Sequence, residues 1–210
     1  MGSAGDGGAP VAKRARVSSD TPPSAAGGAS SGAAASSAAG DGWTPAPAPV
    51  SAESKEKAAR LYVEGGALYD QERWVEARGK FRGAVDADPQ HGDAWLDLGV
   101  VLFHADGKMN SEEEIEAYER AIETNVMTGN YPAIAHNNLG LAIRRLRRDY
   151  RRAEEEYRKA IAINPRFGSA FTNLAILLGP DLHRWPEARD AAAAAAALGM
   201  TTTATQAGVS

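Results

Sequence analysis

The stretch WLDLGVVL, residues 95–102, decides the fold because it returns, with changes, at a regular spacing along the chain. Its glycine, Gly99, lies 34 positions after Gly65 of LYVEGGAL. Farther along, 35 positions separate Gly140 of HNNLGLAI from Ala175 of FTNLAILL. A fixed period of this length is typical of proteins built from repeated supersecondary units. We therefore predict a repeat architecture.

A second series of small and aromatic residues lies downstream of each of these positions. Its four copies are Ala77-x3-Phe81-x2-Ala84, Glu114-x3-Tyr118-x2-Ala121, Ala153-x3-Tyr157-x2-Ala160 and Ala188-x3-Ala192-x2-Ala195. Apolar or small residues at three- and four-residue spacing form one buried stripe on a helix. Each unit is therefore predicted to be a pair of helices, and the fold to be all-α.

Together the two series resemble the tetratricopeptide repeat, which has a period of about 34 residues and the pattern W-x2-L-G-x2-Y, then A-x3-F, then P. Residues 95–102 match the first half of the pattern except at Leu102, and Pro89 and Pro165 close the first and third units where the family has its proline. The resemblance implies a right-handed superhelical array of antiparallel helix pairs. It also implies that the small residue at the centre of each first helix lets the two helices of a pair approach closely.

The repeat pattern covers residues 55–199, which we predict to be the folded part of the chain. The four units are assigned to residues 58–91, 92–127, 133–167 and 168–199. Residues 1–50 consist almost entirely of Gly, Ala, Ser, Pro and Thr. Such a segment cannot bury enough apolar surface to offset the entropy cost of ordering it, so we predict a disordered N-terminal tail. Residues 200–210 are predicted to be a disordered C-terminal tail.

The composition argues against several classes of protein. The hydrophobic fraction of 43% is inflated by alanine, and the sequence has no run of about 18 strongly apolar residues that would span a bilayer. The chain has no cysteine, which removes disulfides, thiolate metal sites and cysteine nucleophiles. The net charge of −4 provides no general attraction to nucleic acid or to an acidic membrane. We expect neither a membrane nor a nucleic acid as the partner.

The N-terminal segment bears on the compartment. It lacks the short apolar core of a secretory signal, so we expect an intracellular protein of the nucleus or the cytoplasm. The sequence KRAR, with Lys13, Arg14 and Arg16, resembles a minimal nuclear import signal. The Ala/Ser-rich composition leaves an organelle transit peptide as the alternative.

The sequence contains no catalytic or metal-binding pattern. The four histidines, His91, His104, His136 and His183, form no H-x3-H pair and have no carboxylate motif at ligand spacing. Glycine clusters occur in the N-terminal tail and at predicted helix contacts, never after a strand pattern, so no phosphate-binding loop is indicated. We therefore expect no enzyme activity, no cofactor and no metal.

A row of polar residues is predicted on the first helices. When each unit is numbered so that its small central residue is position 8, position 6 holds Val63, Asp97, Asn138 and Asn173 in turn. An amide side chain both donates and accepts hydrogen bonds, so it can pair with a peptide backbone without reading its sequence. NNLGLA and TNLAIL resemble the repeats of the O-linked N-acetylglucosamine transferases, whose asparagine ladder lines a concave groove. Asn137 is predicted to face the same side. The alternative is that these are ordinary exposed helix asparagines.

The resemblance implies that a peptide-like partner, extended or helical, lies in this groove. The neighbouring apolar residues of the first two units are Leu96, Val100, Phe103, Tyr62 and Tyr69. A different subfamily, the co-chaperones, binds a C-terminal carboxylate with lysine and asparagine at positions 5 and 9 of its first repeat. Those positions are Tyr62 and Gly66 here, so no such chaperone peptide is expected.

Six arginines gather at the predicted turn of the third unit. They are Arg144, Arg145, Arg147, Arg148, Arg151 and Arg152. The favoured interpretation is a solvated, mutually paired face, because Glu155 and Glu156 lie four residues after Arg151 and Arg152. The alternative is a site for an anionic partner. Arg144 and Arg145 are predicted to reach the groove edge beside Asn138 and to select acidic peptides.

The last predicted helix contains seven successive alanines at residues 191–197, and Ala192 stands where the other units have an aromatic residue. Repeat arrays normally end in a helix with a polar outer face. The favoured interpretation is a terminal helix that forms because alanine has a high helix propensity and that has no partner-binding role. The alternative is a docking face through which the chain self-associates.

Three functions remain open from the sequence. The first is a non-catalytic adaptor or scaffold that holds a peptide-like segment with Asn138 and Asn173. The second is a substrate-recruiting component of a glycosyltransferase system, since the resemblance is to the repeats of such an enzyme. The third and weakest is a nuclear protein whose arginine cluster contacts nucleic acid.

Overall fold

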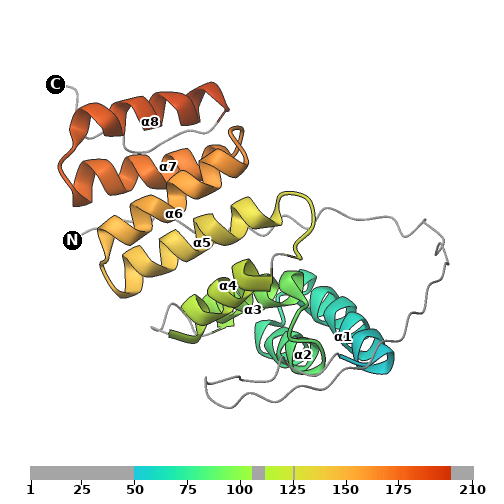
Figure 1. Ribbon diagram of the computed structural model, residues 1–210. Coiled ribbons are helices and arrows are strands. Elements are labelled where there is room, and N and C mark those ends of the chain that lie inside the picture. Colours follow the sequence, from blue (N-terminus) through green and yellow to red (C-terminus); the bar gives the residue numbers. More distant parts are fainter. Residues whose placement is uncertain (1–49, 106–111, 125, 200–210) are drawn as a thin grey trace, which may run out of the picture. The chain divides into compact units, whose positions relative to one another are not determined.

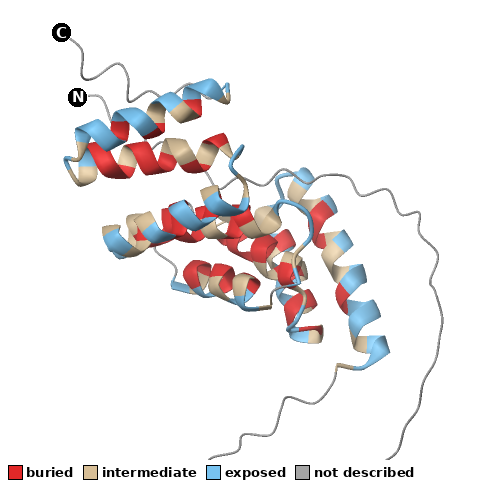
Figure 2. Cartoon of the chain, turned by 45° about the horizontal axis from the view of Figure 1, so that its top comes forward, coloured by how far each residue is buried: buried red, intermediate tan, exposed pale blue. Residues whose placement is uncertain are grey.

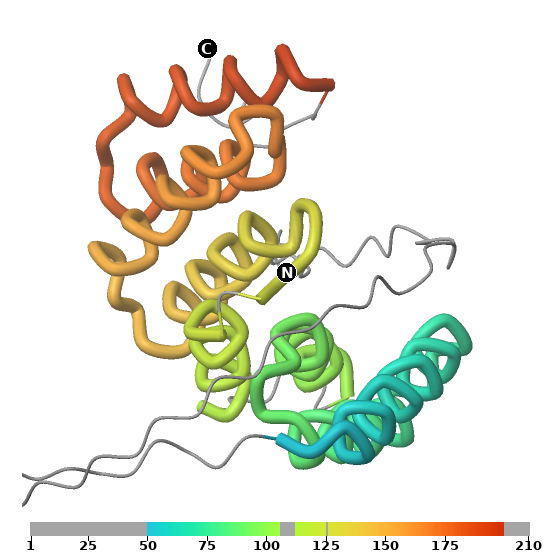
Figure 3. Tube along the Cα trace, turned by 45° about the vertical axis from the view of Figure 1, so that its right-hand side comes forward, coloured from blue at the N-terminus to red at the C-terminus, as the bar shows by residue number. Residues whose placement is uncertain are grey.

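The computed structural model describes residues 50–105, 112–124 and 126–199, and the secondary structure of these residues is entirely helical. The α-helices follow one another as hairpin-like pairs (Figure 1; Figure 3). Their bounds are α1 Ala52–Asp70, α2 Trp74–Ala87, α3 Gly92–Ala105, α4 Glu112–Thr124, α5 Tyr131–Leu146, α6 Tyr150–Ile163, α7 Gly168–Ile176 and α8 Trp185–Ala197. A short π-helix, η1, covers Leu177–Asp181 between α7 and α8.

Each helix packs against its neighbours in the chain. The pairs are α1 with α2, α3 with α4, α5 with α6 and α7 with α8, and the second helix of one pair packs against the first helix of the next. The predicted all-α array of helix pairs is therefore confirmed. None of the helices in the described residues is long and apolar enough to cross a membrane.

In the first three pairs, an aromatic ring lies directly against a glycine. Tyr118 and Tyr157 are fully buried, as is Phe81 of the first pair. A Cβ atom built on Gly99 would lie 2.5 Å from the Tyr118 ring, and one built on Gly140 would lie 2.9 Å from the Tyr157 ring. Any side chain at these positions would push the helices apart. The predicted role of the small central residue is thus confirmed.

The fourth pair departs from this pattern. Its first helix widens into η1, where Pro180 has no backbone N–H to donate and would clash with a normal helical turn. The helix α8 then begins at Trp185 with Pro186 in its first turn, where a proline gives up no intrahelical hydrogen bond. Ala175 replaces the central glycine of this pair, and Ala192 replaces its aromatic ring.

The helices differ in how much of their surface is covered. Figure 2 shows α3 and α5 buried over most of their length, whereas α1 and α8 expose wide faces. The helix α1 begins at Ala52, earlier than the predicted start of the first unit, because the Ser51 side chain caps it by accepting a hydrogen bond of 3.1 Å from the Ser54 N–H. The predicted tails, apart from residue 50, lie outside the described residues.

Candidate functional site

Three asparagines on α5 and α7 form one hydrogen-bonded network. Asn137 donates from Nδ2 to Oδ1 of Asn138 at 3.2 Å, and Asn173 donates from Nδ2 to Oδ1 of Asn137 at 2.9 Å. The exposed fraction is 0% for Asn137, 1% for Asn138 and 8% for Asn173. The alternative of ordinary exposed helix asparagines is therefore wrong. The network joins the third helix pair to the fourth.

Asn137 and Asn173 keep hydrogen-bonding capacity within this network. An asparagine side chain has two N–H donors and a carbonyl oxygen that accepts two hydrogen bonds. Within the network, Asn137 uses one donor and one acceptor, and Asn173 uses one donor. A buried amide gains most from a hydrogen-bond partner, because water cannot satisfy it there.

The polar row continues to Asp97 on α3, which is 6% exposed. Two of the apolar residues expected beside it, Leu96 and Val100, are 2% and 1% exposed and belong to the same hydrophobic core cluster as Leu139 of α5. Phe103 is also buried, at 9% exposed. The structure therefore places Leu96 and Val100 in the core between α3 and α5, and a contact with a partner stays a prediction for them.

Tyr62 and Tyr69 lie on α1 and are half-buried against aromatic neighbours. The Tyr62 ring lies 4.8 Å from the His91 ring, centroid to centroid, and the Tyr69 ring packs edge-on against Trp74 at 4.8 Å. Both tyrosines contact α2 within the first pair, and Tyr69 also lies 6.0 Å from the His104 ring near the end of α3. Their predicted role as groove walls stays a prediction.

Arg145 lies in a buried ion pair rather than at a free edge. Its Nη2 donates to Glu114 of α4, and the two side chains are only 13% and 3% exposed. Its guanidinium also lies 5.1 Å from the centre of the Phe103 ring, a cation–π distance. Burial raises the pKa of Glu114, and the nearby Arg145 opposes that shift without cancelling it. The Nε and Nη1 atoms of Arg145 have no hydrogen-bond partner among the described residues.

Arg144 pairs with Asp181 of η1, and each side chain is about one-fifth exposed, at 20% and 19%. The two arginines expected at the groove edge thus bind acids of different helix pairs. Arg144 reaches forward to the fourth pair, and Arg145 reaches back to the second.

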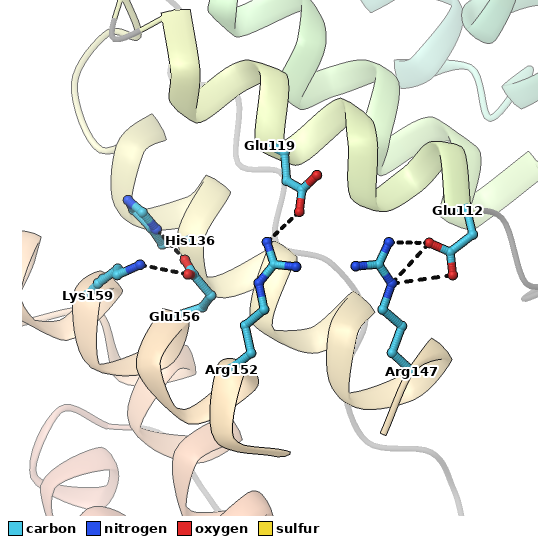
Figure 4. Close-up of polar contacts among 7 residues, drawn as sticks. All are labelled: Glu112, Glu119, His136, Arg147, Arg152, Glu156 and Lys159. Carbon is cyan, nitrogen blue, oxygen red and sulfur yellow. Dashed lines mark hydrogen bonds and ion pairs between the residues drawn. The ribbon is translucent and has the colours of Figure 1, made fainter. Parts of the chain in front are cut away.

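Two more arginines of the turn are also paired across helices. Figure 4 shows Arg147 bound to Glu112 and Arg152 bound to Glu119. The two glutamates lie on α4. The expected pairing of Arg152 with Glu156 along α6 is wrong. The Arg152 side chain instead reaches the Glu119 carboxylate on α4. These contacts support the paired-face interpretation.

Glu156 takes part in a second polar cluster, drawn in Figure 4. Its carboxylate lies 2.7 Å from Nδ1 of His136 on α5 and accepts a hydrogen bond of 2.8 Å from Lys159. Burial alone would raise the pKa of Glu156, but the hydrogen bonds to His136 and Lys159 outweigh it, so the pKa is lowered. His136 therefore joins α5 to α6. No group of three histidine or acidic side chains in the described part of the chain could hold a metal.

Sequence reasoning missed these ion pairs because it searched for partners within one helix. Arg145 lies 31 residues after Glu114, Arg152 lies 33 after Glu119, and Arg147 lies 35 after Glu112. These separations are shorter than the 41 positions between Gly99 and Gly140, so the paired residues are not equivalent positions of their units. Acids on the second helix of one unit and arginines 31–35 residues later are the signal that would have found them, because that helix packs against the first helix of the next unit.

Comparison with known proteins agrees with this geometry. Residues 62–125 match the tetratricopeptide repeat family. No curated protein is significantly similar to the chain in sequence.

Several solved structures have a similar fold. The crystal structure of MamA is 24% identical with a TM-score of 0.59, covering 70% of this chain and 81% of MamA. MamA (residues 41 to the end) from Desulfovibrio magneticus RS-1 is 20% identical with a TM-score of 0.53, covering 69% of this chain and 75% of that one. The first tetratricopeptide domain of Spaghetti (RPAP3), bound to the HSP90 peptide SRMEEVD, is 20% identical with a TM-score of 0.51, covering 59% and 91%. The fold of the described residues is therefore a tetratricopeptide-type array of helix pairs.

Proposed function

We propose that this protein is a non-catalytic scaffold that binds a peptide-like segment of a partner through Asn137, Asn138 and Asn173. The observation that carries the proposal is the amide network between α5 and α7, in which buried side chains retain donors and acceptors. Hydrogen bonds made in such a low-dielectric setting are stronger than those made in water. Amides that pair with a backbone would give affinity with little dependence on sequence.

The same helix face supplies a preference for acidic residues. Arg145 follows Asn138 by seven residues, or two helical turns, so it lies on the same face about 10 Å farther along α5. Its Nε–H and Nη1 groups are buried beside the pair with Glu114 and have no hydrogen-bond partner among the described residues. An extended peptide rises about 3.3 Å per residue. We therefore expect a preference for Asp or Glu about three residues from the amide-bound position.

The related fold supports a peptide ligand, since a tetratricopeptide domain similar in structure is bound to the peptide SRMEEVD. Binding of a chaperone C-terminus is not part of the proposal, because Tyr62 and Gly66 replace the clamp residues. The glycosyltransferase alternative rests on the resemblance of NNLGLA and TNLAIL alone. The nucleic-acid alternative is disfavoured, because four of the six clustered arginines already bind carboxylates.

Selection of random peptides displayed on phage against the full chain would test the proposal. The affinity of a selected peptide is then measured by fluorescence anisotropy for the wild type, Asn173→Ala and the control Asn164→Ala, which changes an asparagine at the end of α6. Loss of one or two hydrogen bonds predicts binding weaker by about tenfold or more for Asn173→Ala only. Equal binding by all three proteins, each with unchanged helical circular dichroism, would show that the network is purely structural.

A further inference from the structure

A hollow of about 270 Å³ lies in the fourth helix pair, between α8 and the end of the preceding helix. It is lined almost entirely by small or apolar side chains. The lining residues are Ala175, Pro180, Trp185, Ala188, Arg189, Ala192, Ala193 and Ala196. Trp185 is 53% exposed, so a large aromatic surface stands beside the hollow in contact with water.

The other repeats show what is missing from this place. Ala175 and Ala192 occupy the positions at which the third pair has Gly140 and Tyr157. There the tyrosine ring is completely buried and lies against the glycine. In the fourth pair, Ala192 brings no ring to this position. The ring of Trp185 packs against Gly179 of η1 instead, and the two alanines line the hollow beside it. The hollow is thus the site of an absent aromatic side chain.

The dimensions suit a ring from another molecule. An apolar cavity of about 150 Å³ in a different protein stays dry and binds benzene. The present hollow is larger, at about 270 Å³, and opens to the surface. Filling it with a ring would bury the exposed face of Trp185 and restore the dispersion contacts that the first three pairs have.

The position of α8 adds a second argument. The helices α2, α4 and α6 are each covered by the first helix of the next pair, whereas no further helix follows α8 in the described residues. A partner helix stacked on α8 would take the place of a next first helix. It would cover the alanines and bring a side chain to the hollow.

Charge distinguishes a partner protein from a second copy of this chain. Arg189 lies in the lining, which contains no acid, and it forms no ion pair with a described residue. The lining residues of α8 run from Trp185 to Ala196, and Arg189 lies near the middle of this stretch. If two copies of α8 packed antiparallel about a twofold axis at that middle, their Arg189 residues would lie within about one helical turn, roughly 5 Å, along the helix axis. Two like charges facing each other without an acid oppose that arrangement.

We propose that the open end of the array binds a helix of a partner protein that inserts an aromatic side chain into the hollow and places an acidic residue one turn away against Arg189. Acidic and aromatic residues three or four positions apart lie on one face of a helix. The partner would supply the ring that the fourth repeat lacks. This surface is separate from the amide network of α5 and α7.

The test uses the full chain and two small probes, p-cresol and 4-hydroxyphenylacetate, which adds a carboxylate to the same ring. Binding is followed by the amide and indole signals in a proton–nitrogen correlation spectrum, with the Trp185 indole signal identified from Trp185→Phe. We expect saturable shifts at Trp185, Ala175 and Ala192. We also expect the charged probe to bind several-fold more tightly, and Arg189→Gln to abolish that difference.

Two variants control for the position. Ala192→Phe fills the hollow, so it should abolish probe binding and raise the thermal midpoint. Ala197→Phe adds the same ring at an exposed position outside the lining and should do neither. If Ala192→Phe folds poorly, Ala192→Leu provides a smaller filler with the same expected direction. Shifts that do not saturate, or that persist in Ala192→Phe, would overturn the proposal. So would a concentration-dependent dimer in sedimentation that Ala192→Phe dissociates, because the occupant would then be a second copy.

Discussion

The third and fourth helix pairs follow the same repeat but are held together differently. Between α5 and α6, the Tyr157 ring fills the space above Gly140, and His136 binds Glu156. Between α7 and α8, two alanines face a hollow, and the buried residues of α8 are all alanines. The repeat period determines that both helix pairs form. The residue at the aromatic position, Tyr157 or Ala192, determines whether the space between the two helices is filled or left as a hollow.

The largest effect is expected from making the third pair resemble the fourth. Tyr157→Ala would remove a fully buried ring from Gly140 and leave a cavity, with a loss of about 3–5 kcal/mol in the free energy of unfolding. Urea unfolding followed by circular dichroism measures this loss. Tyr157→Phe is the control, because the Tyr157 hydroxyl is buried without a hydrogen-bond partner among the described residues, so its removal should cost little. Equal destabilisation by both variants would contradict the assigned role of the ring.

A buried ion pair should matter more than a partly exposed one at the end of the array. Arg145→Met leaves Glu114 buried without its cation, which predicts a loss of about 3–5 kcal/mol in the free energy of unfolding. Arg184 binds Glu154 at 2.7 Å between the third and fourth pairs, but its side chain is 39% exposed, so Arg184→Met should change the urea midpoint much less.

The double variant Arg145→Met, Glu114→Met sharpens this comparison. Removing both charges leaves no unpaired ion in the core, so much of the stability lost in Arg145→Met should return. A double variant as unstable as Arg145→Met would mean that the packing of the arginine stem, and not its charge, holds α4 to α5.

The smallest effect is a difference in pH dependence between two buried glutamates. The pKa of Glu156 is lowered in the folded protein, so its contribution is present above the ordinary glutamate pKa of about 4.3 and is lost as the pH falls through the lower folded value. The pKa of Glu114 is raised, because burial outweighs Arg145, so its contribution is present at low pH and is lost as the pH rises through the folded value.

Unfolding free energies of the wild type, Glu156→Gln and Glu114→Gln from about pH 3 to pH 6 would check these signs. The advantage of the wild type over Glu156→Gln should grow with rising pH, and its advantage over Glu114→Gln should shrink. Parallel curves for the two variants would show that the carboxylates are in similar surroundings, contrary to the structure.

Much of the architecture follows from local pattern. The spacing of Gly65, Gly99, Gly140 and Ala175 is visible in the chain, and it requires close helix contacts at those positions. The start of α8 at Trp185 and Pro186 also follows from the rules for helix ends. Contacts between units were harder to predict from the sequence. Arg152, for example, binds Glu119 on α4 and not Glu156, which lies on the same helix as Arg152. Both partners satisfy local charge rules, and only packing distinguishes them.

The sequence by itself determined the helix pairs, their order and the rings that close the first three, because periodic burial of small and apolar residues is a local property of each helix. The tertiary structure decided that Asn137 and Asn173 bind each other, that Arg144 and Arg145 bind acids in different pairs, and that Ala192 leaves a hollow. Those outcomes depend on distances between helices that lie about one repeat apart in the chain, and such distances are set only when the whole array is packed.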